Sequence, residues 1–233
     1  TAYEIVSRDW SSDVCSSDLV WNSEQLRQTR LMMLNNQVPS SCTKCFQEEK
    51  LGIASKRQWE SKVWEQRINI EDIVSKTSDD GSLPVSIPYF DLRLGNLCQL
   101  KCIMCSPHDS SAWIKEWKAQ YPKYKTYELK HDQSWNIDFD YTWYMKGDFL
   151  ESMKQQSHNI KELYFAGGEP LIMEEHYRLL KELVAQKRFD VRLQYNTNFS
   201  RLNLKDENVL DYWELFNSVS RSEEHTSELQ SRE

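Results

Sequence analysis

Glycine and proline are scarce in this sequence, each occurring 6 times in 233 residues. That composition excludes collagen-like and low-complexity chains, which need far more of both. Long apolar runs are also missing, and no segment approaches the ~20 consecutive apolar residues of a membrane-spanning helix. Residues 1–20 lack the basic start and the apolar stretch of a secretory signal. We therefore expect a globular, cytoplasmic chain with no membrane partner.

A surplus of positive charge is missing as well. The formal net charge is −7, which gives no support for a nucleic-acid partner bound through its phosphates. Aromatic side chains, by contrast, are plentiful, with 9 Trp, 11 Tyr and 8 Phe. The chain therefore has the length and the large apolar side chains for one large domain or two small ones.

The two ends of the chain differ in kind from the rest. Residues 221–231 read RSEEHTSELQS, the translation of a common sequencing-library adapter, and residues 9–18, DWSSDVCSSD, translate its opposite strand. Ser7-Arg8 at one end and Arg232-Glu233 at the other fit one shared sample index. We therefore predict that residues 1–19 and 221–233 are adapter-derived and not native, and we exclude them from fold and function. Residues 20–220 are then expected to be an internal piece of a gene.

Helix and strand patterns alternate between these ends. A helix is expected at residues 20–36, and a second helical stretch at 46–65. The turn-rich residues 76–84 separate an N-terminal segment, residues 20–84, from a second domain, residues 85–220. In the second domain, strands are predicted at 87–94, 162–165, 191–195 and from 216, and helices at 109–120, 147–156, 174–186 and 206–213. Such alternation predicts an α/β fold with a parallel sheet or barrel; residues 121–145 stay unassigned.

Three cysteines lie close together directly after the first predicted strand. They are Cys98, Cys102 and Cys105, in the pattern C-x3-C-x2-C. Thiolates bind soft metals and iron–sulfur clusters, and three thiolates on a four-iron cluster leave one iron open to another ligand. An open coordination position is typical of a catalytic metal site. Zinc held by the same thiolates and a fourth ligand such as His108 is the alternative that the spacing leaves open.

A glycine-rich quartet directly follows the second predicted strand. It reads Gly167-Gly168-Glu169-Pro170. Two glycines let a ligand approach the backbone closely and leave N–H and C=O groups free to bind it. Glu169 can accept hydrogen bonds from an ammonium group. By itself, the quartet is also typical of an ordinary turn.

In their order and context, the two motifs resemble those of the radical S-adenosylmethionine (radical SAM) superfamily. That family has C-x3-C-x2-C after the first strand of a partial barrel and a Gly-Gly-Glu motif after the second. The resemblance implies that Cys98, Cys102 and Cys105 hold a [4Fe–4S] cluster whose open iron binds S-adenosylmethionine, and that the Gly-Gly-Glu motif binds its amino group. The implied activity is reductive cleavage of S-adenosylmethionine to a 5′-deoxyadenosyl radical, which abstracts hydrogen from a substrate.

Two further positions are candidate cofactor-binding residues. Met104 stands where the family has an aromatic residue packed near the adenine, and methionine can supply a similar apolar contact. Asn198 ends the third predicted strand, where related enzymes have Thr-Asn-Gly and where strand ends face the active site of a barrel. Phe199 replaces that glycine, and an ordinary turn asparagine is the alternative for Asn198.

The N-terminal segment resembles the twitch-type segment of some radical SAM proteins. The resemblance includes Arg30, Pro39, Cys42-x-x-Cys45 and Arg57. In that family such cysteines join others upstream to ligate an auxiliary iron–sulfur cluster, so Cys42 and Cys45 are candidate ligands of one. Two thiolates alone cannot complete a four-thiolate site, and a partial zinc site or two unliganded thiols are the alternatives.

The resemblance also implies an electron donor such as flavodoxin or ferredoxin. A peptide or protein substrate is expected by family analogy alone. Because a radical SAM barrel has six strands and residues 20–220 supply three or four, we expect a truncated barrel that does not turn over by itself. A zinc-binding structural or adaptor module and a non-functional gene fragment are the alternative functions.

Overall fold

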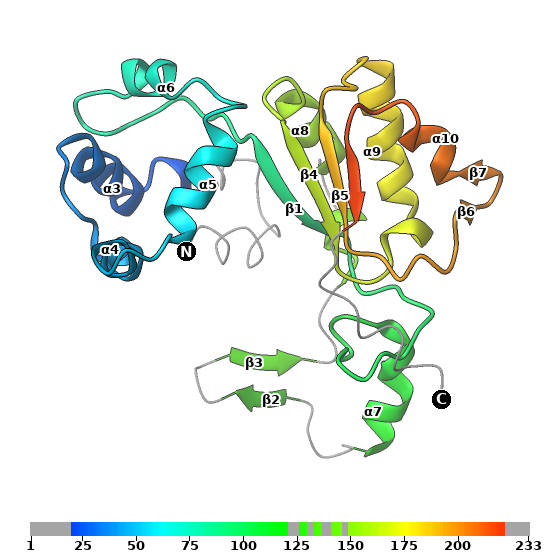
Figure 1. Ribbon diagram of the computed structural model, residues 1–233. Coiled ribbons are helices and arrows are strands. Elements are labelled where there is room, and N and C mark those ends of the chain that lie inside the picture. Colours follow the sequence, from blue (N-terminus) through cyan, green and yellow to red (C-terminus); the bar gives the residue numbers. More distant parts are fainter. Residues whose placement is uncertain (1–19, 121–125, 130–132, 137–140, 146–148, 222–233) are drawn as a thin grey trace. The chain divides into compact units, whose positions relative to one another are not determined.

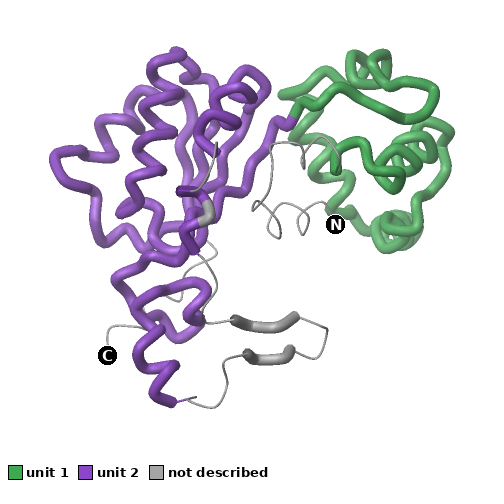
Figure 2. The backbone as a smooth tube through the Cα atoms, turned by 180° about the vertical axis from the view of Figure 1, so that it is seen from behind, with its two compact units in different colours: residues 1–86 green, residues 87–233 purple. Residues whose placement is uncertain are grey.

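A computed structural model describes residues 20–120, 126–129, 133–136, 141–145 and 149–221. The ends that the sequence predicts to be adapter-derived lie outside these residues, apart from Arg221. The chain forms two compact units, the first ending at Ser86 and the second starting at Ile87 (Figure 2). The first unit is helical, and the second contains a parallel sheet.

The first unit consists of short helices joined by turns (Figure 1). They are α3 (Glu24–Leu34), the 3-10 helix η1 (Ser40–Cys42), α4 (Thr43–Lys50), α5 (Lys56–Trp64) and α6 (Ile70–Lys76). Polar contacts join the start of this unit to its end. The side-chain amide of Asn22 exchanges hydrogen bonds of 3.0 and 3.1 Å with the backbone of Leu83. Arg30 donates to the carbonyls of Trp21 and Gly81, so the segments before α3 and after α6 are held together.

The helical stretch predicted at residues 46–65 is two helices, so the prediction of one continuous helix is wrong. Gly52 has a φ of +76°, a left-handed conformation that suits glycine and ends α4. Ser55 then begins α5 with a capping box. Its hydroxyl accepts from the Gln58 N–H at 3.2 Å, and the Gln58 side chain accepts from the Ser55 N–H at 3.4 Å. These local stop and start signals outweigh the helical periodicity that runs through them.

The second unit is built on a four-stranded parallel sheet with the strand order β1-β4-β5-β8. The strands are β1 (Tyr89–Arg93), β4 (Glu162–Ala166), β5 (Arg192–Tyr195) and β8 (Val219–Arg221). Along the chain, helix α8 (Phe149–Gln156) precedes β4, α9 (Glu174–Ala185) precedes β5 and α10 (Val209–Trp213) precedes β8 (Figure 1). The predicted α/β fold with a parallel sheet is therefore confirmed.

One face of the sheet is apolar and covered by helices. Alternate strand residues share a face, and those of this face are buried: Phe90, Leu92, Leu163, Phe165, Leu193 and Tyr195. Helix α8 contributes Met153 to the same core, and α9 contributes Leu180 and Leu183. Removing this apolar surface from water is the main force that holds the helices on the sheet.

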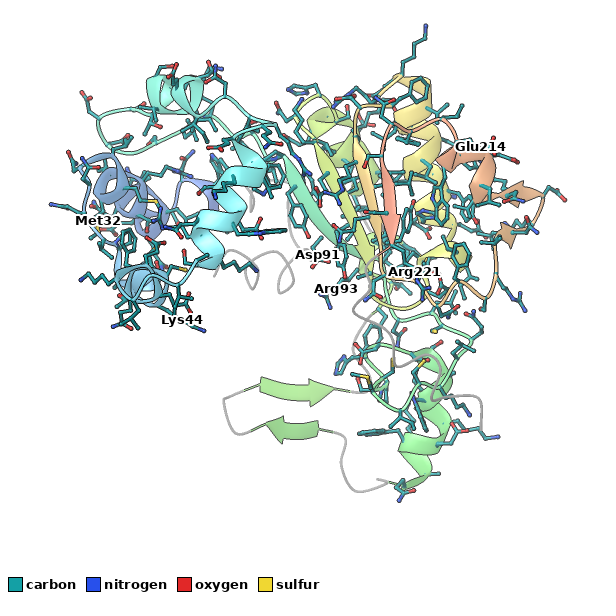
Figure 3. All side chains as sticks on the ribbon, viewed as in Figure 1. Met32, Lys44, Asp91, Arg93, Glu214 and Arg221 are labelled. Carbon is teal, nitrogen blue, oxygen red and sulfur yellow. The ribbon has the colours of Figure 1, made fainter. Side chains whose placement is uncertain are left out.

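The opposite face of the sheet is polar. The register places Asp91, Tyr164, Gln194 and Ser220 in one row across the four strands. Asp91 also forms an ion pair with Arg93 on the edge strand β1, at 3.2 Å (Figure 3). Parallel sheets normally have both faces covered by apolar layers. The polar row therefore suits this face to a polar interior or a ligand.

The remaining elements lie outside the sheet. Residues 121–145, which the sequence pattern does not assign, contain the antiparallel pair β2 (Thr126–Leu129) and β3 (Gln133–Asn136) and the 3-10 helix η3 (Trp143–Met145). The predicted helix at 109–120 is a 3-10 helix, η2 (Ser111–Trp113), followed by α7 (Ile114–Gln120). A second small pair, β6 (Asn203–Leu204) with β7 (Glu207–Asn208), precedes α10. Among the described residues, no helix combines the length and the apolar character that crossing a membrane requires.

His176 is a fully buried titratable side chain in α9. It is 0% exposed, and its Nε2 atom lies 2.8 Å from the hydroxyl of Tyr195. The ring also packs edge-on against Phe165, with 4.8 Å between centroids. Its Nδ1 atom has no hydrogen-bond partner within the described part of the chain. Burial lowers the pKa of His176 to about 3, so the imidazole is neutral in the folded state.

We predict that His176 makes the second unit sensitive to acid. Its pKa is about 3 when folded and about 6.5 when unfolded. Between these values the unfolded state binds more protons, so stability is lost as the pH falls through this window. At 1.36 kcal/mol per pKa unit, lowering the pH from about 7 to about 5 should cost about 2 kcal/mol.

Urea unfolding at the two pH values measures this loss. His176→Gln should remove most of it, whereas His158→Gln, which changes an exposed histidine, should leave it intact. The same pH dependence in His176→Gln as in the wild type would contradict the prediction.

Candidate functional site

Both sequence motifs lie at the same edge of the sheet. The cysteine loop, residues 94–110, follows β1, and the glycine turn, residues 167–169, follows β4. The two strands pair directly, with Arg93 opposite Ala166 at their carboxyl ends. The β5 loop, residues 196–200, leaves the next strand at the same edge. Carboxyl ends of parallel strands are where ligands commonly bind in α/β proteins.

Backbone hydrogen bonds join the glycine turn to the cysteine loop. The Gly168 N–H donates to the carbonyl of Gly95 at 3.1 Å, and the Glu169 N–H donates to the carbonyl of Leu97 at 2.7 Å. A Cβ atom on Gly168 would overlap the Leu97 carbonyl, and one on Gly167, where φ is +101°, would lie 2.9 Å from the Gly95 oxygen. The sequence suggests that the glycines make room for a ligand; in the structure they make room for the cysteine loop.

The cysteine loop is held in shape by its own hydrogen bonds. The buried side chain of Asn96 donates to the carbonyl of Pro107 at 2.7 Å. The Cys102 carbonyl accepts from the Cys105 N–H and from the Trp113 indole, each at 3.0 Å. Trp113 therefore fixes the loop between the second and third cysteines in addition to packing.

The three cysteines of the loop are half-buried free thiols. Burial raises the pKa of Cys98, and it raises the pKa of Cys105 to about 12, with neighbouring Cys102 and Asp109 adding to the rise. A bound metal displaces such protons, because the thiolate is the ligand. Among the described residues, no group of three or more His, Cys, Asp or Glu side chains is arranged to hold a metal ion. The donor set, three thiols on one loop, fits an iron–sulfur cluster in chemical kind.

Glu169 is a buried carboxylate, with 1% of the residue exposed. Its Oε1 atom accepts from the Thr197 hydroxyl at 2.6 Å and from the Leu171 N–H at 3.0 Å. Its Oε2 atom accepts from the Asn198 N–H at 2.8 Å. The carboxylate therefore ties the glycine turn to the β5 loop. The sequence predicts Glu169 as an acceptor for a ligand, and the structure adds this internal role.

Asn198 lies beside the first cysteine. Its Nδ2 atom is 3.8 Å from the Sγ atom of Cys98. Its Oδ1 atom accepts from the Ser200 N–H at 3.0 Å and from Gln99 Nε2 at 3.3 Å. The structure thus brings the cysteine loop, the glycine turn and the β5 loop together. Thr197, which sequence reasoning missed, belongs to this group; its place beside Asn198 at a strand end is the signal that could have found it.

Met104 and Pro170 have contrasting surroundings. Met104 is 70% exposed in the cysteine loop, so its side chain is open to contact with a bound molecule. Pro170 is buried and begins the 3-10 helix η4 (Pro170–Ile172) directly after Glu169. The fixed φ of proline suits the first position of a helix, so Pro170 sets the direction of the chain as it leaves the glycine turn.

Cys42 and Cys45 belong to the first unit. Cys42 is the last residue of η1, Cys45 lies in the first turn of α4, and both are half-buried free thiols. Arg57 interacts electrostatically with both thiols and forms an ion pair with Glu49. Residues 20–86 contain no third cysteine, so the auxiliary cluster stays a prediction.

His108, the fourth ligand of the zinc alternative, has another contact. Its Nδ1 atom is hydrogen-bonded to the hydroxyl of Tyr141, and the two rings meet edge-on with 5.5 Å between centroids. Burial lowers the pKa of His108. One of its two ring nitrogens is therefore already engaged.

Comparison with known proteins found no matching family model, no matching curated protein and no matching solved structure. The function proposed below therefore rests on the residues and the geometry of this chain.

We predict that Glu169→Gln destabilises the second unit. An NH2 group in place of one carboxylate oxygen would face an N–H or O–H donor, and a buried polar group left without its partner costs about 1–3 kcal/mol. Glu174→Gln is the matched control, because Glu174 is exposed and its surface ion pair with Lys205 contributes little to stability. Urea unfolding compares the two variants, and equal free energies of unfolding would show that the buried carboxylate is not a structural tie.

Proposed function

We propose that this chain belongs to a radical SAM enzyme and binds a [4Fe–4S] cluster through Cys98, Cys102 and Cys105, with S-adenosylmethionine beside it. One observation carries the proposal. The C-x3-C-x2-C loop and the Gly-Gly-Glu-Pro turn, far apart in the sequence, are hydrogen-bonded to each other at the carboxyl ends of two paired parallel strands.

The sheet supports a partial (β/α) barrel as the fold of this enzyme. Its four strands are all parallel and lie in the order of the sequence, with a helix before each of the last three. Right-handed crossovers in this order place the helices on one face, and the apolar face does hold α8 and α9. In a barrel the opposite face lines the interior, where the row of Asp91, Tyr164 and Gln194 would face the substrate.

The chain's own residues bind and orient the reactants. The cluster, when bound, supplies an electron that cleaves S-adenosylmethionine and releases a 5′-deoxyadenosyl radical. The three thiolates hold the iron, and the exposed side chain of Met104 offers an apolar surface to the adenine. Glu169 fixes the glycine turn against the cysteine loop, and the turn presents its backbone to the methionine amino group. A flavodoxin or ferredoxin as electron donor and a peptide or protein as substrate are part of the proposal.

The test is the metal content of the chain after anaerobic reconstitution. We expect about four irons and four sulfides per chain. A triple variant, Cys98→Ala with Cys102→Ala and Cys105→Ala, should lose them. The matched control, Cys42→Ala with Cys45→Ala, should retain them, because these thiols belong to the first unit. Extra iron in the wild type that the control variant loses would assign an auxiliary cluster to Cys42 and Cys45.

Binding of S-adenosylmethionine gives a second readout. Its addition should change the electron paramagnetic resonance spectrum of the reduced cluster, because it occupies the open iron. Zinc in the wild type, with no sulfide taken up under reconstitution, would overturn the proposal and leave a zinc-binding structural module.

A further inference from the structure

We propose that Asn198 is a positioning residue that donates a hydrogen bond to the sulfur of Cys98 and thereby sets the reduction potential of the cluster. The inference rests on the proposed function, because it concerns a thiolate that would hold the cluster. In this inference Asn198 donates to the sulfur of Cys98, whereas the family resemblance suggests a contact with S-adenosylmethionine. The donor comes from the end of β5, whereas the cysteine follows β1.

The orientation of the Asn198 amide follows from its other contacts. The backbone N–H of Ser200 can only donate, so the atom that faces it at 3.0 Å must be the amide oxygen. Gln99 donates to the same oxygen at 3.3 Å, and the Gln99 side chain is itself held by the hydroxyl of Ser200. The NH2 group is therefore turned toward the Sγ atom of Cys98, at 3.8 Å.

The backbone of Asn198 is fixed by the buried carboxylate of Glu169. The Asn198 N–H donates to Glu169 at 2.8 Å, and the adjacent Thr197, which is 3% exposed, donates to it at 2.6 Å. The backbone N–H of Leu100 and the hydroxyl of Ser110 also face Cys98. Both belong to the cysteine loop and move with it. Asn198 is the donor that a separate strand holds in place.

A donor at this sulfur acts on the electron affinity of the cluster. The reduced cluster carries one more negative charge than the oxidised cluster, and part of that charge lies on the sulfurs. An N–H group beside a sulfur therefore stabilises the reduced state more, and hydrogen bonds to the sulfurs are among the factors that set cluster potentials. Loss of the donor should move the midpoint potential to more negative values.

Asn198→Leu tests the inference, because leucine keeps the branched shape of asparagine and lacks its N–H donor. In the reconstituted chain we expect the ratio of reduced to oxidised cluster at a fixed potential to fall about tenfold, which is ~59 mV for one electron. Redox titration followed by electron paramagnetic resonance measures the midpoint. Gln99→Leu, at an exposed residue, removes one of the two contacts that orient the amide. It should shift the midpoint less than Asn198→Leu, in the same direction. Asn203→Leu makes the same change at an exposed asparagine of β6 and should leave the midpoint unchanged.

The outcomes separate this inference from the proposed function. A wild-type chain that takes up no iron and sulfide overturns the proposed function, and the inference with it. A chain that holds the cluster with the same midpoint in the wild type and in Asn198→Leu overturns the inference alone, and shows that the contact is merely structural. If Asn198→Leu does not fold, Asn198→Ala decides, because it removes the same donor with a smaller side chain, and a wild-type midpoint in that variant overturns the inference.

Discussion

The buried carboxylate of Glu169 is the contact on which the candidate site depends. A charged group inside a protein is tolerated only when its oxygens accept hydrogen bonds. Here three donors come from η4 and from the β5 loop, so the carboxylate links the end of β4 to the end of β5. The Glu169 N–H meanwhile binds the cysteine loop. Glu169 therefore joins the loops that follow β1, β4 and β5 at one edge of the sheet.

The two faces of the sheet have different roles: one carries the hydrophobic core, and the other carries polar side chains. The apolar face carries the core with α8 and α9 and includes the aromatic contacts between His176, Phe165 and Tyr195. The polar face adds little to that cluster and carries ion pairs instead, between Asp91 and Arg93 and between Glu162 and Arg192. Because the strands are parallel and in sequence order, the loops that carry the motifs leave the core at one edge, beside the polar face. Substitutions in the core and in the loops should therefore act largely independently.

Sequence reasoning succeeded where one physical signal dominates. Helix α9 and strand β5 match their predicted ranges within a residue at each end, because alternating burial leaves a strong periodicity. Sequence reasoning failed where local stop and start signals compete with helical periodicity. Gly52 and Ser55 carry such signals, and they divide the helical stretch predicted at residues 46–65. Helix α6 was missed, and the pair β2–β3 lies in a stretch of mixed aromatic and charged residues with no clear period.

The candidate site, too, could be predicted only in part from the sequence. The cysteines and the glycine turn could be located from the sequence, because parallel strands bring their carboxyl ends to one edge. The role of Thr197 and the contact of Asn198 with Cys98 could not, because both depend on side chains that meet only when separate strands pair.

The close approach of the glycine turn to the cysteine loop constrains how this sequence can diverge. A side chain at Gly168 would overlap the Leu97 carbonyl whether or not any cofactor binds, and Glu169 must satisfy the same internal donors. A descendant without the proposed cluster would still need both residues to keep this packing. Its three loop cysteines, half-buried and outside the core, would be free to drift. In this architecture the three sulfurs are therefore tied to the proposed metal site, whereas the glycine motif is tied to the packing of the two loops.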